Sequence, residues 1–226
     1  MELAVLLSGG KDSHLAMFRA MKHHEISCLI SIESENKESY MFHVPNIHIT
    51  ELQAKAMEIP LIKQVTKGEK EGELDDLKVA IEKAIDEYGI EGVVSGAIRS
   101  TYQASRIQKI CKDLDIWCFN PLWLEDEETI LKELIDNGFE VIITGVFSYP
   151  FEKDMLGKKI DENMIELLRK TKKLYGISLV GEGGEFETTV LDAPFYKRRI
   201  KIIESEISYS NYSGMLIIKK AKLVKK

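Results

Sequence analysis

Cysteine is scarce in this sequence, and the few cysteines present form no recognisable pattern. Cys28, Cys111 and Cys118 make neither a CxxC pair nor any other spacing typical of metal ligands. An odd number of cysteines also argues against a framework of disulfides. We therefore expect three buried thiols and no metal centre built on them.

Long apolar runs and an excess of positive charge are also missing. The first stretch, MELAVLLSGGKDS, contains too short an apolar run to span a bilayer and has no basic leader, so we expect a cytoplasmic protein without a membrane anchor. A formal net charge of -6 gives no overall reason to bind nucleic acid. The five lysines within residues 219–226 are expected to form a solvated tail.

The sequence does have the apolar content of a globular protein, with 44% hydrophobic residues, and a regular alternation of patterns. Short apolar runs alternate with segments whose apolar residues recur at helical spacing. We expect strands over residues 2–7, 26–32, 60–66, 93–95 and 116–119, and helices over 13–21, 47–57, 72–88 and 101–114. This α/β alternation predicts a parallel sheet with helices on both faces.

The pattern changes gradually after Pro121. Helices are expected over residues 126–137 and 161–175 and a strand over 140–147. Beyond Gly181 only strand-like segments remain, near residues 188–191, 199–207 and 215–218. We therefore predict a first domain over residues 1–120 and a second, smaller α+β domain over residues 121–226.

The polar link SGGKDS joins the first expected strand to the first expected helix. Residues in such a link lie at the carboxyl edge of a parallel sheet, where a helix N-terminus attracts anions. Glycines let the backbone approach phosphate oxygens, hydroxyls and a lysine add donors, and an aspartate can hold Mg²⁺ against a polyphosphate. We therefore predict that phosphates of a nucleotide bind at Ser8, Gly9, Gly10, Lys11, Asp12 and Ser13.

The link differs from the common P-loop of ATPases, because Val5 stands where that pattern needs a glycine and Asp12 follows Lys11 in place of Ser or Thr. The alternative interpretation is a glycine-rich turn with a serine or aspartate capping the helix. The clustering of all six residues at a ligand-binding edge favours the phosphate site.

Three further stretches carry side chains suited to chemistry. SYMFH contains His43, a candidate for hydrogen bonding or proton transfer that could equally be a surface histidine. GAIRSTYQASR begins with a glycine suited to a close approach to nucleotide and continues with donors for an anionic group, although a helix cap with solvated arginines is the simpler alternative. Its candidates are Gly96, Arg99, Tyr102, Gln103 and Arg106.

The third stretch, GEGGEFET, gathers glycines and three glutamates just before an apolar segment. Its carboxylates could bind Mg²⁺, an ammonium ion or a cationic substrate, and an acidic β-turn is the alternative. We take Glu182, Gly183, Gly184, Glu185 and Glu187 as candidate substrate-binding residues.

SGGKDS after an N-terminal strand resembles the pyrophosphate-binding loop of the N-type ATP pyrophosphatases. The resemblance implies their adenine-nucleotide alpha-hydrolase-like (HUP, Rossmann-like) fold, with ATP and Mg²⁺ as cofactors. It also implies cleavage between the α and β phosphates, which releases pyrophosphate. Residues 1–120 would then bind the nucleotide, with Lys11 and Asp12 catalytic and Asp12 as the Mg²⁺ ligand, and residues 121–226 would bind the substrate.

SGGKDS, SYMFH, GAIRSTYQASR, NPLW and GEGGEFETTVLDAPF together occur in the order seen in the diphthine–ammonia ligase family, and the short archaeal form is the most similar. This resemblance covers most of the chain. It implies that ATP activates the carboxylate of diphthine, a modified histidine of translation elongation factor 2, and that ammonia displaces AMP to form the amide. Since Met1 is followed by Glu2 and not by a glutaminase cysteine, we expect free ammonium as the nitrogen source.

Two alternatives remain open at this stage. A tRNA-thiolating or lysidine-forming enzyme uses the same adenylation, although it commonly needs paired cysteines or a basic face. A non-catalytic nucleotide-binding module would not need both Lys11 and Asp12. A homo-oligomer is compatible with the sequence, and the adenine is expected near Ile32 and Glu33, at the carboxyl end of the second strand.

Overall fold

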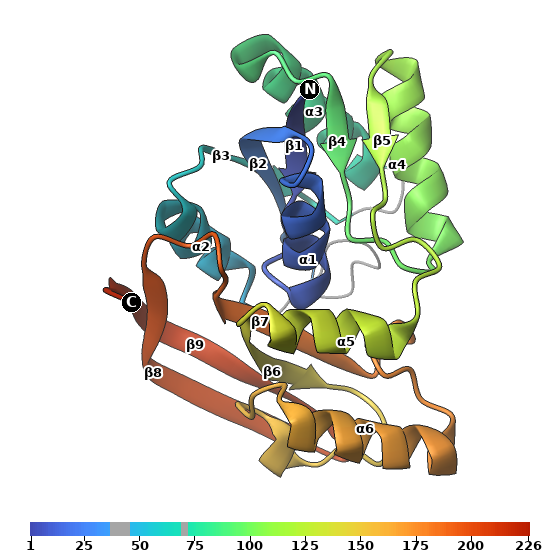
Figure 1. Ribbon diagram of the computed structural model, residues 1–226, viewed down its shortest axis with the longest axis vertical. Coiled ribbons are helices and arrows are strands. Elements are labelled where there is room, and N and C mark those ends of the chain that lie inside the picture. Colours follow the sequence, from blue (N-terminus) through green and yellow to red (C-terminus); the bar gives the residue numbers. More distant parts are fainter. Residues whose placement is uncertain (37–45, 69–71) are drawn as a thin grey trace.

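The computed structural model describes residues 1–36, 46–68 and 72–226, and its first layer is a five-stranded parallel sheet (Figure 1). The strand order is β3-β2-β1-β4-β5. The strands are β1 (Glu2–Leu6), β2 (Glu25–Ser34), β3 (Leu61–Thr66), β4 (Gly92–Val94) and β5 (Trp117–Phe119). The order reverses between β1 and β4, which creates the crevice where open α/β sheets bind ligands.

Four helices cover the two faces of this sheet: α1 (Lys11–Ala20), α2 (Thr50–Met57), α3 (Gly72–Tyr88) and α4 (Thr101–Asp113). Alternate residues of β1 are buried on opposite faces, because side chains alternate along a strand. Ala4 packs with residues of α3 and α4, whereas Leu3 and Val5 pack with residues of α1 and α2. The expected sheet with helices on both faces is confirmed.

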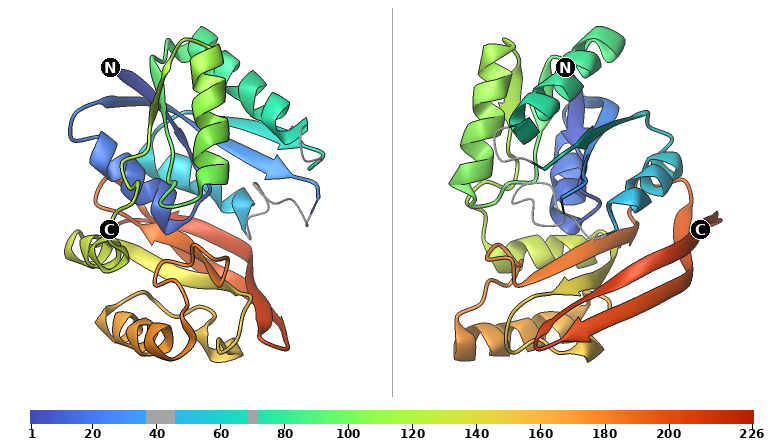
Figure 2. Two further views of the ribbon diagram at one scale, coloured as in Figure 1. Left: turned by 90° about the vertical axis from the view of Figure 1, so that its right-hand side faces the viewer. Right: turned by 180° about the vertical axis from the view of Figure 1, so that it is seen from behind.

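The second layer is an antiparallel sheet of order β7-β6-β9-β8. It contains β6 (Glu140–Val146), β7 (Phe186–Asp192), β8 (Arg199–Ser210) and β9 (Ser213–Val224), and it is accompanied by α5 (Glu127–Asp136) and α6 (Glu162–Tyr175). The views in Figure 2 show this layer lying beneath the parallel sheet, on the side of α1 and α2, with α6 farthest away. The smaller α+β unit is therefore present.

The two layers share one hydrophobic core. Leu15 and Met17 of α1 are fully buried in the same cluster as Val190 of β7 and Ile143 of β6. Arg19 adds polar contacts across the layers, since its guanidinium bonds the carboxylates of two glutamates in and before α5. The short 3-10 helices Ile47–Ile49 and Lys153–Met155 complete the described elements.

The lysines near the end of the chain are exposed, as expected, but the segment is part of a strand. β9 continues from Ile218 to Val224 as the partner of β8, although its lysines point to solvent. Lys226 then donates to the carbonyl of Ala193 at 2.6 Å and pairs with Asp192 at 2.8 Å. The sequence pattern missed this extension because a lysine-rich segment resembles free surface until a partner strand is known. Among the described residues, none of the helices has the length and apolarity needed to cross a membrane.

Candidate functional site

A cavity of about 460 Å³ opens at the point where the strand order reverses. It is lined by residues 6–8 and 11–13 from the end of β1 and the start of α1, and by 95–97 after β4. The far wall comes from the second layer, through residues 180–184, Phe186 and Glu187. Ile30 and Ile32 of β2 supply apolar surface in the region expected for the adenine.

The SGGKDS link forms a tight turn held by its own hydroxyls. Gly9 has φ +87°, a conformation that disfavours other residues. Gly10 has φ -87° and caps α1, so Gly9 is the glycine of this link with positive φ. The hydroxyl of Ser8 accepts from the Gly10 N–H at 3.4 Å and lies 3.2 Å from the hydroxyl of Ser13. These contacts shape the turn before any ligand binds.

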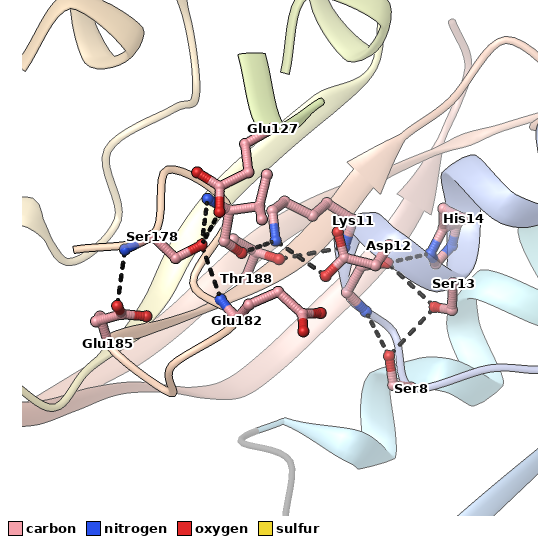
Figure 3. A network of polar contacts seen from close by, with 12 residues as sticks. Ser8, Lys11, Asp12, Ser13, His14, Glu127, Ser178, Glu182, Glu185 and Thr188 are labelled. Atoms are coloured by element: carbon pink, nitrogen blue, oxygen red, sulfur yellow. Dashed lines mark hydrogen bonds and ion pairs between the residues drawn. The ribbon is translucent and has the colours of Figure 1, made fainter. Parts of the chain in front are cut away.

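Lys11 and Asp12 lie at the start of α1 and face the second layer (Figure 3). Lys11 is only 2% exposed. Its ammonium group donates to Asp12 Oδ2 at 2.9 Å and to the carbonyl of Val180 at 2.5 Å. Its backbone N–H donates to Thr188 Oγ1 at 3.1 Å, so β7 occupies one of the free N–H groups expected at this helix end.

The other carboxylate oxygen of Asp12, Oδ1, is buried and has no hydrogen-bond partner. A buried carboxylate oxygen without a partner is costly unless a cation completes it. Mg²⁺ at a polyphosphate usually takes one or two carboxylates and several phosphate or water oxygens. Asp12 therefore fits the protein's share of such a site, and the described residues contain no group of three or more metal-binding side chains that would suggest another.

Gly96 brings the loop after β4 against the start of α1. A Cβ atom at this position would lie 2.7 Å from the Ser13 backbone nitrogen and 2.8 Å from the Asp12 carbonyl carbon. Gly96 also lines the cavity. The close approach expected from the sequence is therefore made in part to the SGGKDS link itself.

The candidates on α4 and in the segment just before it divide into two groups. Gln103 lines the cavity, and its N–H is capped by the side chain of Ser100 at 3.3 Å. Arg99 is exposed, and the Arg106 guanidinium stacks over the Tyr102 ring at 3.5 Å. None of these three is among the residues that line the cavity.

The glutamates of the GEGGEFET loop also divide. Glu182 and Glu187 line the cavity together with Gly183 and Gly184. Glu185 lies outside the cavity lining and accepts the N–H groups of Ser178 at 2.8 Å and Gly183 at 2.9 Å. The Glu185 carboxylate therefore holds together the turn from which Glu182 and Glu187 face the cavity.

Glu127, at the first position of α5, holds the chain just before the same loop (Figure 3). It accepts from Lys172 at 2.5 Å, the Ser178 hydroxyl at 3.0 Å and the Leu179 N–H at 3.1 Å. Burial acts to raise the pKa of Glu127, but these three bonds bring it below its usual value. Glu127 thus remains a carboxylate that fixes the carbonyl of Val180 opposite Lys11.

The two glutamates in the cavity experience the opposite effect. Burial raises the pKa of Glu187 to about 7, with Asp12 adding to the shift and Lys11 opposing it. Burial also raises the pKa of Glu182, and the charge of Asp12 adds to that shift. A nearby cation would stabilise the charged form of each glutamate.

Sequence patterns did not single out the contacts that fasten the SGGKDS link and His14 to the second layer. His14 Nδ1 donates to the Gly10 carbonyl at 2.8 Å, and His14 Nε2 accepts from the Tyr196 hydroxyl at 2.7 Å. Gln53 donates to the carbonyls of Gly9 and Val190, both at 2.9 Å. These residues come from separate parts of the chain, and no local signal links them. His43 lies outside the described residues.

Cys111 and Cys118 lie next to each other, as free thiols, on α4 and β5. A hydrogen bond from Cys111 lowers the pKa of Cys118. Neither thiol lines the cavity. The pair therefore offers no support for thiolation chemistry at this site.

Comparison with known proteins identifies the family. A model described as the diphthamide synthase N-terminal domain matches residues 1–117, and one described as the diphthamide synthase C-terminal domain matches residues 126–224. The chain belongs to the diphthamide synthase family. The predicted resemblance to this family is thereby confirmed.

Relatives of this family member are named diphthine–ammonia ligase. The rat protein is 36% identical, with 91% of this chain aligned to 84% of the relative, and the human protein is 33% identical, with 92% aligned to 85%. The fission yeast protein is 30% identical over 92% of this chain but only 37% of its own length. A solved structure described as a predicted subunit of tRNA methyltransferase from Methanocaldococcus jannaschii aligns with a TM-score of 0.44 and 21% identity, over 85% of this chain and 98% of that one.

Proposed function

We propose that this chain uses ATP to amidate the diphthine residue of translation elongation factor 2, with ammonium as the nitrogen source and AMP and pyrophosphate as products. Family membership supports the reaction. The observation that carries it is the shared cavity, where Lys11 and Asp12 of the phosphate loop lie opposite Glu182 and Glu187 of the second layer. One half is suited to ATP and the other to a cationic or amine-bearing acceptor.

Activation is needed because a carboxylate is a poor electrophile. Transfer of AMP to the diphthine carboxylate makes the carbonyl carbon reactive and provides a stable leaving group. Lys11 offsets negative charge that develops at the phosphates, and the low solvent exposure of its ammonium group strengthens this effect. The N-terminus of α1 acts in the same direction.

Mg²⁺ bound here would supply positive charge that offsets the charge of the phosphates. Asp12 is the residue that would hold it, through the buried oxygen that has no protein partner. Ser8, Gly9, Gly10 and Ser13 would contact phosphates.

On the acceptor side, Glu182, Gly183, Gly184 and Glu187 form the cavity wall. Gln103 would contact either the nucleotide or the acceptor, whereas Arg99, Tyr102 and Arg106 would contact the elongation factor outside the cavity. Glu185 would act through the loop that it closes. His43 keeps its proposed substrate role. The reaction would take place in the cytoplasm, where elongation factor 2 works.

The decisive experiment supplies ATP, Mg²⁺, ammonium and elongation factor 2 bearing diphthine, and measures nucleotide products and the mass of the modified histidine. The expected result is AMP and pyrophosphate in step with conversion of carboxylate to amide. The same assay with unmodified elongation factor 2 is the control and should yield no AMP. Formation of ADP and phosphate, or amidation without AMP, would contradict the proposal.

A further inference from the structure

The cavity has an unusual balance of charge for a site that accepts ATP. Among its described lining residues, the charged side chains are Lys11, Asp12, Glu182 and Glu187, one cation against three carboxylates. Lys11 is already paired with Asp12. ATP brings further negative charge, so the cavity needs more than one cation when substrates are bound.

Mg²⁺ accounts for only part of this need. Asp12, at the phosphate loop, is the carboxylate suited to Mg²⁺, whereas Glu182 and Glu187 come from the opposite wall. Glu182 has partial compensation, because the Arg99 N–H donates to its Oε2 at 3.3 Å. The glutamates at positions 182 and 187 thus form a second acidic region on the acceptor side.

Of the three carboxylates in the cavity, that of Glu187 has the fewest groups to offset its negative charge. Its carboxylate makes no hydrogen bond or ion pair with any other residue that the structure describes, and burial raises its pKa to about 7. Its neighbour across the β6–β7 pair is Gly145, which provides no side chain to pair with it. The next residue, Thr188, binds the backbone of Lys11. Glu187 is therefore an unpaired carboxylate held beside the phosphate loop.

We propose that Glu187, assisted by Glu182, binds the ammonium ion that becomes the amide nitrogen. This inference rests on the proposed amidation and deepens it by assigning the nitrogen site. Ammonium is compact and donates four N–H bonds, which carboxylate oxygens accept. A quaternary ammonium group has no N–H to donate and is recognised by aromatic faces. Among the described lining residues, the aromatic side chain is that of Phe186, whose ring already faces Lys11 at 5.5 Å.

The chemistry at Glu187 balances. Ammonium gives one proton to the Glu187 carboxylate and becomes ammonia with a free electron pair. That pair forms the C–N bond at the acyl carbon, and the C–O bond to AMP breaks with its electrons leaving on the phosphate. The nitrogen then loses a second proton to solvent, which leaves the neutral amide.

The test separates activation from transfer in the Glu187→Gln variant. Activation is followed by exchange of labelled pyrophosphate into ATP with diphthine-bearing elongation factor 2 and no nitrogen source. Transfer is followed with ammonium and, separately, with hydroxylamine, which is a neutral nucleophile near pH 7 and needs no anionic site. We expect unchanged exchange, unchanged use of hydroxylamine, and kcat/KM for ammonium reduced about 10- to 100-fold, the range for loss of a charged hydrogen bond.

Each other outcome overturns the inference. An equal loss with both nucleophiles would assign Glu187 to positioning the acyl group, and a raised KM for elongation factor 2 would assign it to the quaternary ammonium of diphthine. Loss of exchange would assign it to ATP or Mg²⁺, and an unchanged variant would assign it no role. Absence of exchange in the unaltered protein would instead refute the proposed function.

Two further variants keep the test decisive. Glu204→Gln makes the same chemical change on the exposed face of β8 and should match the unaltered protein in all three assays. Glu187→Asp keeps the charge but withdraws it by one methylene, and it should restore part of the ammonium use if the Gln variant folds poorly. No recovery in a folded Asp variant, with hydroxylamine use also lost, would count against an ammonium site.

Discussion

The ammonium group of Lys11 donates a hydrogen bond of 2.5 Å to the backbone carbonyl of Val180, which lies 169 positions further along the chain. The bond crosses from the parallel layer to the antiparallel one. It joins the residue expected to neutralise phosphate charge to the loop expected to receive the acceptor. One side chain therefore connects the two halves of the proposed reaction. Phosphates that attract the Lys11 ammonium group would compete for it with the Val180 carbonyl.

Replacing Lys11 with Ala should abolish pyrophosphate exchange, with a loss of about 100-fold or more, because a preorganised charge in a site of low exposure is removed. Exchange of labelled pyrophosphate into ATP is the measurement. Lys170→Ala, on the exposed face of α6, is the matched control. Exchange within a few-fold of the unaltered rate would show that Lys11 only links the two layers.

Asp12→Asn should raise the Mg²⁺ concentration needed for half-maximal exchange by about tenfold or more, since a charged ligand is lost. A Mg²⁺ titration of the exchange reaction checks this. Removing Mg²⁺ with a chelator should stop exchange in the unaltered protein. If the variant shows the same Mg²⁺ dependence at a reduced rate, Asp12 acts by orienting Lys11 and not by holding the metal.

Gly96→Ala should destabilise the protein by about 1–3 kcal/mol, because its Cβ would meet backbone atoms of Asp12 and Ser13 that cannot move without shifting α1. Urea unfolding gives the change in stability, and exchange should fall as well. Gly89→Ala is the comparison. Gly89 has φ +61° but open space around it, so this substitution should destabilise the protein through backbone conformation and not through a clash. Equal effects on exchange would argue against the steric role of Gly96.

Tyr196→Phe should cost about 1–3 kcal/mol, because it leaves Nε2 of the fully buried His14 without a donor. Burial lowers the pKa of His14 to about 4, so the imidazole stays neutral and cannot compensate by taking a proton near pH 7. Denaturant unfolding at neutral pH measures the loss. A variant as stable as the unaltered protein would show that this bond does not fasten the layers.

Glu187→Gln should stabilise the protein more at pH 8 than at pH 5. The pKa of Glu187 is raised to about 7 by burial, so its stabilising contribution is present while it is protonated and is lost as pH rises through that value. Glutamine resembles the protonated form at every pH. The gain should be about 2 kcal/mol larger at pH 8, measured by urea unfolding at both pH values. A pH-independent difference would place Glu187 in a well-solvated environment.

Local patterns predicted the parallel sheet and its helices because apolar spacing reports directly on strands and amphipathic helices. They also pointed to the ligand-binding edge, since a glycine-rich link between a strand and a helix lies there in any such sheet. Glu185 shows the limit: its residue type suggested the cavity, but its carboxylate turns back onto the N–H groups of its own loop. Side-chain direction within an irregular loop is not encoded in spacing.

The sequence by itself determined the residue types available at the site and, through SGGKDS and GEGGEFET, the family to which the chain belongs. Only the tertiary structure decided which side chains meet. Val180, Thr188 and Tyr196 reach Lys11 and His14 because β7 and the segments on either side of it pack against α1. The Glu187 carboxylate is left unpaired because Gly145, its neighbour on β6, has no side chain. Such contacts depend on the packing of two layers around a shared core, which brings together residues that no periodicity along the chain connects.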